Sequence, residues 1–128
     1  MPKIKILIID DEVDFGKLVK LTLEAGGDFE VSIATDGMNG LAEAQKKPDL
    51  ILLDIRMAGM DGIEVLKRLR KDKNTINIPV VMLTAIGYKP FQVRAEELYA
   101  EEYITKPIEA FDLKVKINEV LKNRGSGH

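Results

Sequence analysis

One stretch of the sequence ends four consecutive apolar residues in a carboxylate: Leu50-Ile51-Leu52-Leu53-Asp54. An apolar run of this length, without polar alternation, is typical of a strand buried on both faces of a parallel sheet. A carboxylate beside a core is costly to desolvate unless it has a partner. Ligands of open parallel sheets bind beyond the carboxyl ends of the strands. Asp54 is therefore a candidate site residue, and Asp61 is better placed to cap the helix that follows.

Five short segments have strand character, and each is followed by a helical pattern. The predicted strands cover residues 4–9, 29–34, 50–53, 80–83 and 102–105. This alternation predicts an α/β fold in which helices cover both faces of a parallel sheet. For five strands the common doubly wound order is 2-1-3-4-5, the flavodoxin-like order, with a switch point between the first and third strands. We expect one domain over residues 3–122 and a disordered, vector-derived tail over residues 123–128.

The helical patterns also predict which faces are buried. In the first helix, the apolar or small residues at three- and four-residue spacing are Phe15, Leu18, Leu21, Thr22 and Ala25. A loop at residues 87–90 precedes a short fourth helix, whose apolar face carries Phe91, Ala95 and Leu98. The apolar stripe of the final helix consists of Leu113, Ile117, Val120 and Leu121.

Composition excludes several classes of function. The chain has no cysteine, and so neither a disulfide framework nor a thiolate metal site. Its one histidine is His128, at the end of the chain, which argues against a Ser-His-Asp triad and a histidine zinc site. A net charge of −2 gives no electrostatic support for direct nucleic-acid binding. No apolar segment approaches the ~20 residues of a membrane span and no signal peptide opens the chain, so a cytoplasmic location is expected.

Polar residues gather where the predicted strands end. Asp10 and Asp11 follow the first strand, Asp54 the third, Thr84 the fourth and Lys106 the fifth. Carboxylates held close together bind either protons or a cation, and ligands that are all oxygen suit Mg²⁺, with Mn²⁺ also acceptable. A lysine and a hydroxyl suit phosphoryl oxygens, so these parts fit phosphoryl transfer onto a carboxylate. Taken singly, each has an ordinary explanation, such as an acidic helix start or a surface lysine.

The same residues fall in four short motifs, at positions 8–11 (IIDD), 49–54 (DLILLD), 83–85 (LTA) and 103–107 (YITKP), and a fifth motif lies at 57–62 (MAGMDG). In this order and spacing the sequence resembles the receiver domain of two-component response regulators, from Lys3 to about Lys122. The resemblance implies that Asp54 accepts a phosphoryl group from the phosphohistidine of a sensor histidine kinase or a phosphotransfer protein. It further implies that Asp11, Asp54 and the backbone carbonyl of Arg56 hold Mg²⁺.

The resemblance also assigns supporting and switching roles. Asp10 would support the metal site through water, and Lys106 and Thr84 would bind the phosphoryl group. Tyr103 would turn inward as Thr84 moves, and the Lys106-Pro107 bond would be cis. The surface formed by the fourth helix, the fifth strand and the final helix would then change, for recognition by an output domain, a partner protein or a second copy of the chain. Such a protein catalyses only its own phosphorylation and dephosphorylation.

Three residues depart from the family pattern or flank the site. Ala58 stands where proline is usual, which implies a less rigid loop after Asp54. Tyr99 stands where glycine is common, so we expect the fourth helix to end differently or Tyr99 to contact a partner. Ile86 is bulky, and we hypothesise that it impedes the attacking water and lengthens the phosphorylated state. An unchanged phosphoaspartate lifetime in Ile86→Ala would contradict this hypothesis.

Other functions on similar folds have less support in the sequence. A flavodoxin needs a Ser/Thr/Gly-rich phosphate loop where Asp10-Asp11-Glu12 stands, and a dinucleotide-binding domain needs a G-x-G-x-x-G motif there. A haloacid-dehalogenase phosphatase carries a second aspartate at the position of Arg56. A receiver-like module that acts by protein interaction alone, without phosphorylation, is the remaining alternative. Loss of a key site residue would be its signature.

Overall fold

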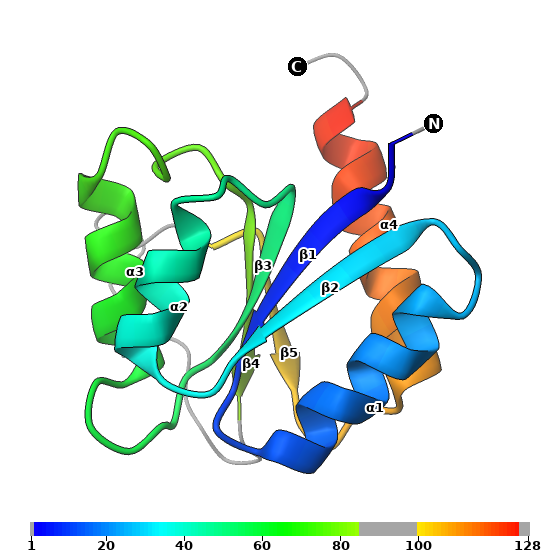
Figure 1. Ribbon diagram of the computed structural model, residues 1–128, viewed down its shortest axis with the longest axis horizontal. Coiled ribbons are helices and arrows are strands. Elements are labelled where there is room, and N and C mark those ends of the chain that lie inside the picture. Colours follow the sequence, from blue (N-terminus) through cyan, green and yellow to red (C-terminus); the bar gives the residue numbers. More distant parts are fainter. Residues whose placement is uncertain (1, 85–99, 126–128) are drawn as a thin grey trace.

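The computed structural model describes residues 2–84 and 100–125 (Figure 1). Five strands form one sheet in the order β2-β1-β3-β4-β5, and every neighbouring pair is parallel. The strands are β1 (Ile4–Ile9), β2 (Phe29–Ala34), β3 (Leu50–Asp54), β4 (Val80–Thr84) and β5 (Glu102–Thr105). The predicted α/β fold and its 2-1-3-4-5 order are therefore confirmed.

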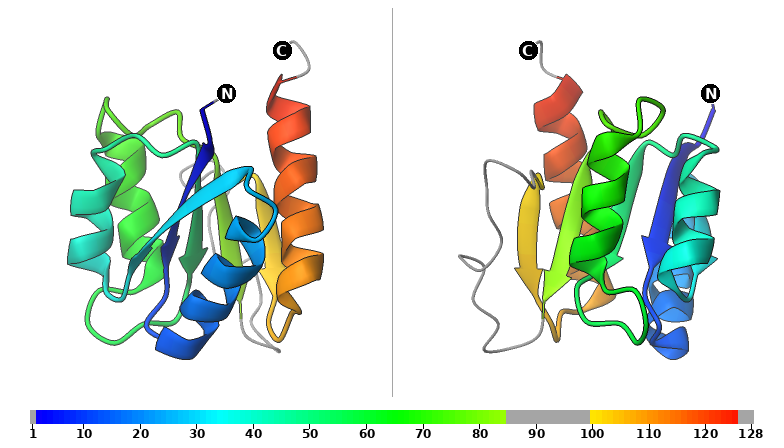
Figure 2. Two further views of the ribbon diagram at one scale, coloured as in Figure 1. Left: turned by 45° about the vertical axis from the view of Figure 1, so that its right-hand side comes forward. Right: turned by 90° about the vertical axis from the view of Figure 1, so that its left-hand side faces the viewer.

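Helices cover both faces of this sheet (Figure 2). Along the described chain they are α1 (Val13–Glu24), α2 (Gly37–Ala44), α3 (Gly62–Lys71) and α4 (Ala110–Gly125). Strand side chains alternate between two cores: Ile8 and Leu52 pack with α1 and α4, whereas Ile9 and Leu53 pack with α3. Residues 6–9 of β1 and 50–53 of β3 are buried on both faces, and each of these stretches is a continuous apolar run.

The parallel register brings the polar strand ends to one edge of the sheet. Ile9 pairs with Leu53, Asp54 pairs with Leu83, and Thr84 pairs with Thr105. The residues that follow these pairs leave the sheet at the same end, where the strands point in Figure 1. Residues far apart in the sequence therefore meet there.

The predicted buried face of α1 is wrong except at Phe15, which is partly buried and packs against the core. Leu18 and Leu21 are 53% and 70% exposed, and the buried residues are Gly16, Val19 and Leu23. Two polar side chains fix the rotation of the helix against the edge strand β2. Lys20 Nζ donates to the carbonyl of Val31 at 2.6 Å, and the Val31 N–H donates to Glu24 at 2.9 Å. These bonds satisfy backbone groups on the outer edge of the described sheet. Val19 and Leu23 are also four residues apart, so apolar spacing alone allows either face.

The last helix differs from prediction at its end. α4 continues to Gly125, beyond the expected domain end at residue 122 and into the tail expected to be disordered. Once Leu113, Ile117 and Val120 anchor a helix in the core, further polar residues extend it without a new nucleation cost. The fourth predicted helix, Ile86 and Tyr99 lie outside the described residues. None of the helices described is long and apolar enough to cross a membrane.

Candidate functional site

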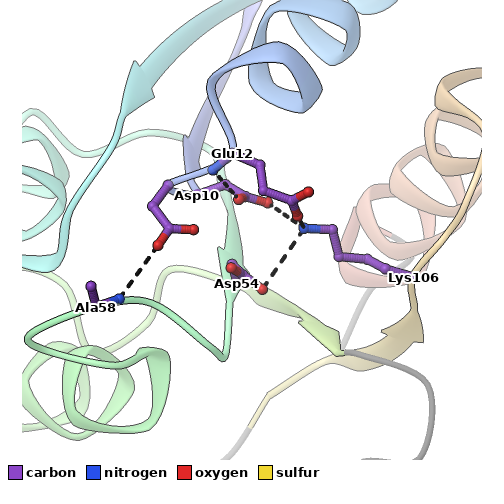
Figure 3. A network of polar contacts seen from close by, with 6 residues as sticks. Asp10, Glu12, Asp54, Ala58 and Lys106 are labelled. Carbon is purple, nitrogen blue, oxygen red and sulfur yellow. Dashed lines mark hydrogen bonds and ion pairs between the residues drawn. The ribbon is translucent and has the colours of Figure 1, made fainter.

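Three carboxylates meet at the carboxyl edge of the sheet (Figure 3). One oxygen from each of Asp10, Asp11 and Asp54 lies within 4.8 Å of the others. A cavity of about 640 Å³ opens onto Asp11 and Asp54, and its lining also includes Arg56 and Lys106. The predicted convergence of these residues is therefore observed in the structure. Their individual roles stay predictions.

Asp10 is fully buried, and both of its oxygens have a partner. Oδ1 accepts a hydrogen bond from the backbone N–H of Glu12, and Oδ2 accepts one from Lys106 Nζ, each at 2.9 Å. Burial raises the pKa of Asp10, although both hydrogen bonds oppose that shift. Asp10 thus fits a supporting position behind the other two carboxylates.

Asp54 has fewer partners and a more perturbed carboxyl group. It is only 5% exposed, and Lys106 Nζ lies 3.9 Å from its Oδ1. Burial and the nearby charge of Asp10 raise the pKa of Asp54 to about 7, against the opposing charge of Lys106. A cation placed beside such a carboxyl group stabilises its charged form.

Asp11 is exposed and faces the loop that follows Asp54. Its Oδ2 accepts a long hydrogen bond, 3.4 Å, from the backbone N–H of Ala58 (Figure 3). A proline at position 58 would have no N–H to donate, so the departure at Ala58 makes this contact possible. Among the described residues, Asp11 and Asp54 offer carboxylate oxygens toward the cavity, and Arg56 lines it. Such a donor set fits a hard divalent cation.

Lys106 crosses from β5 toward β1. Its backbone N–H donates to the carbonyl of Thr84 at 2.6 Å, and the Lys106-Pro107 bond is cis, as predicted. Its Nζ bonds Asp10 and Glu12 and lies 4.5 Å from the ring centre of Phe15. Burial lowers the pKa of Lys106, but the hydrogen bonds to these two carboxylates outweigh burial and leave the pKa raised.

Thr84 and Tyr103, the predicted switch residues, lie on neighbouring strands but at different depths. Thr84 is buried at the end of β4, one residue beyond the partner of Asp54. Tyr103 pairs with Met82 and is partly buried against the core beneath α2 and α3. The structure therefore brings Thr84 to the site and leaves Tyr103 further down the sheet.

Three residues at the site were missed by sequence reasoning. Glu12 was considered only as part of the Asp10-Asp11-Glu12 run after the first strand, and Phe15 only as part of an apolar helix face. Gly62 is the third: its N–H donates to the carbonyl of Ile55 at 2.8 Å, and a Cβ there would lie 2.1 Å from the carbonyl oxygen of Asp54. Its place after the Asp61 cap, which accepts from the Glu64 N–H at 3.0 Å, was the available signal.

A family model described as the response regulator receiver domain matches residues 6–118. The chain belongs to the response regulator receiver domain family. This receiver domain is 40% identical to the DNA-binding dual master transcriptional regulator RpaA of Synechocystis, over 92% of the chain and 49% of that protein. It is 38% identical to the phosphate regulon transcriptional regulatory protein PhoB of Pseudomonas aeruginosa, over 95% of the chain and 53% of that protein.

Solved structures agree with this assignment. The receiver domain superimposes on the Vibrio cholerae chemotaxis protein CheY4 with a TM-score of 0.83 and 30% identity, covering 93% of the chain and 99% of that one. By contrast, it spans about half the length of the two transcriptional regulators. The likeness to known proteins thus covers the domain and leaves the activity of any longer protein open.

Proposed function

We propose that this receiver domain accepts a phosphoryl group on Asp54 from the phosphohistidine of a sensor histidine kinase or phosphotransfer protein. One observation carries the proposal: a buried carboxylate at a strand end lies among two further carboxylates, with an ammonium group within 4 Å. No binding site for a metabolite is needed for this chemistry. The domain would catalyse only its own phosphorylation and dephosphorylation.

The transfer exchanges one bond to phosphorus for another. A carboxylate oxygen of Asp54 attacks phosphorus, so that an O–P bond forms as the N–P bond of phosphohistidine breaks. The imidazole nitrogen leaves with the electron pair and takes up a proton. Lys106 offsets the charge that develops on the phosphoryl oxygens, and the Thr84 hydroxyl donates a hydrogen bond to one of them.

A divalent cation fits this reaction. Asp11, Asp54 and the backbone carbonyl of Arg56 would hold Mg²⁺, with Asp10 supporting the site through water. When bound, Mg²⁺ supplies positive charge that lets an anionic donor approach an anionic acceptor. Mn²⁺ suits the same oxygen ligands.

The response would pass to a partner through a surface formed by β5, α4 and the predicted fourth helix, which lies outside the described residues. Movement of Thr84 toward the phosphoryl group, followed by Tyr103, would change that surface. The transcriptional relatives support an output domain or partner protein as the recipient, in the cytoplasm. The same surface would serve a homodimer. A module that binds without phosphorylation is the weaker alternative, because Asp11, Asp54, Thr84 and Lys106 are all present.

The test is phosphorylation without a kinase. The protein is incubated with Mg²⁺ and acetyl phosphate, and intact mass is measured beside Asp54→Ala. We expect one phosphoryl adduct on the wild type, dependent on Mg²⁺, and none on the variant. An adduct that persists in Asp54→Ala would refute the assignment of the acceptor. Failure of the wild type to take up either the phosphoryl group or beryllofluoride would refute the function.

A further inference from the structure

The ammonium group of Lys106 is bonded away from the carboxylate that it is expected to serve. Nζ donates to Asp10 Oδ2 at 2.9 Å and also to Glu12 Oε1, whereas Asp54 Oδ1 is 3.9 Å away (Figure 3). The last distance is an ion pair without a hydrogen bond. Two of the three N–H donors of the lysine are thus in use before any phosphoryl group arrives.

The two carboxylates that hold Lys106 differ in how easily they release it. The side chain of Asp10 is 0% exposed, so removal of the ammonium group would leave a buried charge without its cation. The side chain of Glu12 is 62% exposed, so water replaces the lysine at little cost. Any exchange of partners by Lys106 therefore occurs at Glu12.

We propose that Glu12 is a positioning residue that holds the Lys106 ammonium group off Asp54 in the unmodified domain and releases it to an anion bound there. Lys106 keeps its hydrogen bond to Asp10 throughout, and the phosphoryl oxygens replace Glu12 as its second acceptor. This inference rests on the proposed function, because it concerns the same site. Its consequence is that Glu12 weakens the binding of phosphoryl-like anions.

The first readout is beryllofluoride affinity in the presence of Mg²⁺, measured by calorimetry on the whole chain. Because partly exposed ion pairs contribute little, Glu12→Gln is expected to tighten beryllofluoride binding by about two- to fivefold. Loss of one negative charge would by itself favour an anion, so two controls are needed. Asp14→Asn removes an exposed charge from the first turn of the same helix and leaves Lys106 untouched.

Glu12→Asp separates contact from charge. It keeps the charge but shortens the side chain by one methylene, while the bond from the backbone N–H of residue 12 to Asp10 fixes the main chain. We expect Glu12→Asp to bind beryllofluoride more tightly than the wild type, as Glu12→Gln does. Asp14→Asn is expected to match the wild type.

The second readout observes the lysine directly, without metal or anion. The ¹⁵N signal of the Lys106 ammonium group, assigned by its loss in Lys106→Arg, should shift in Glu12→Gln and Glu12→Asp and stay fixed in Asp14→Asn. An unmoved signal overturns the inference. So does a Glu12→Gln whose affinity equals that of a wild type that binds beryllofluoride, or a Glu12→Asp that behaves as wild type. A wild type that takes up neither beryllofluoride nor a phosphoryl group refutes the proposed function, and this inference with it.

Discussion

The carboxyl group of Asp54 makes the metal-free domain sensitive to pH. Its pKa in the fold is about 7, above the value of a free aspartate, so the folded state binds the proton more tightly than the unfolded state. The stability that this group contributes is fully present below the unfolded pKa and is lost as pH rises through 7. Asp54 should therefore cost the domain stability at and above neutral pH.

Replacement of Asp54 by asparagine tests this effect. With a metal chelator present, Asp54→Asn should have a higher free energy of unfolding than the wild type. This difference should grow by about 2 to 3 kcal/mol between about pH 5 and pH 8. Urea unfolding at both pH values gives the comparison. Asp14→Asn serves as a control, with a difference from wild type that does not change with pH. An advantage for Asp54→Asn that is constant across the range would contradict the raised pKa.

At the scale of residues, the sequence predicted the location of those side chains whose place follows from the end of a strand. Asp10, Asp11, Asp54, Thr84 and Lys106 all lie at one edge because each follows a parallel strand, and strand ends follow from apolar runs. The contacts of Glu12 and Phe15 with Lys106 could not be predicted in this way. They depend on where long side chains point between residues far apart in the sequence, 94 positions in the case of Glu12 and Lys106, which no local pattern records.

At the scale of elements, the start of α3 depends on close contact with β3. A Cβ at Gly62 would lie 2.1 Å from the carbonyl oxygen of Asp54. This oxygen belongs to the backbone of β3, which cannot move aside as a flexible side chain can. Gly62→Ala should destabilise the domain by about 2 to 4 kcal/mol.

Gly59→Ala is the matched control. The φ of Gly59 is 76°, in the left-handed region, but a Cβ there would have nothing within 4 Å. Its cost should be only about 1 kcal/mol. Equal losses in chemical denaturation would contradict the packing argument.

The observed face of α1 can be tested with two leucines. Leu23 is 0% exposed and Leu21 is 70% exposed. Leu23→Ala should cost about 2 to 4 kcal/mol of unfolding free energy, whereas Leu21→Ala should cost less than about 0.5 kcal/mol. Both are measured by urea titration. A larger loss in Leu21→Ala than in Leu23→Ala would contradict the observed face and support the one predicted from spacing.

That face was mispredicted for a physical reason. The helix has one apolar stripe through Leu18 and Leu21 and another through Val19 and Leu23, and spacing does not distinguish them. The bonds of Lys20 and Glu24 to Val31 accompany the second stripe. The helix start at Asp61 was predicted correctly, because Asp61 accepts a hydrogen bond from the backbone N–H three residues later. Caps are local in sequence, whereas the rotation of a helix is decided by its neighbours.

For the molecule as a whole, a cation at the acidic edge should couple to stability. Mg²⁺ at about 100 times its dissociation constant should raise the free energy of unfolding by about 2.7 kcal/mol, provided that the unfolded chain does not bind it. Protons compete for Asp54, so the rise in Tm should be larger at about pH 8 than at pH 5.5. Thermal unfolding with and without chelator measures both effects. Asp11→Asn should lose most of the rise, and an undiminished rise in that variant would place the cation elsewhere.

The strand order also has a consequence for biosynthesis. Asp10 leaves the ribosome early and its partner Lys106 follows 96 residues later, directly after the strand that completes the described sheet. A growing or truncated chain that lacks β5 carries the acceptor aspartate without the lysine beside it. On the proposed function, only finished and correctly assembled molecules could then report a stimulus, so that the topology itself screens out signals from immature protein.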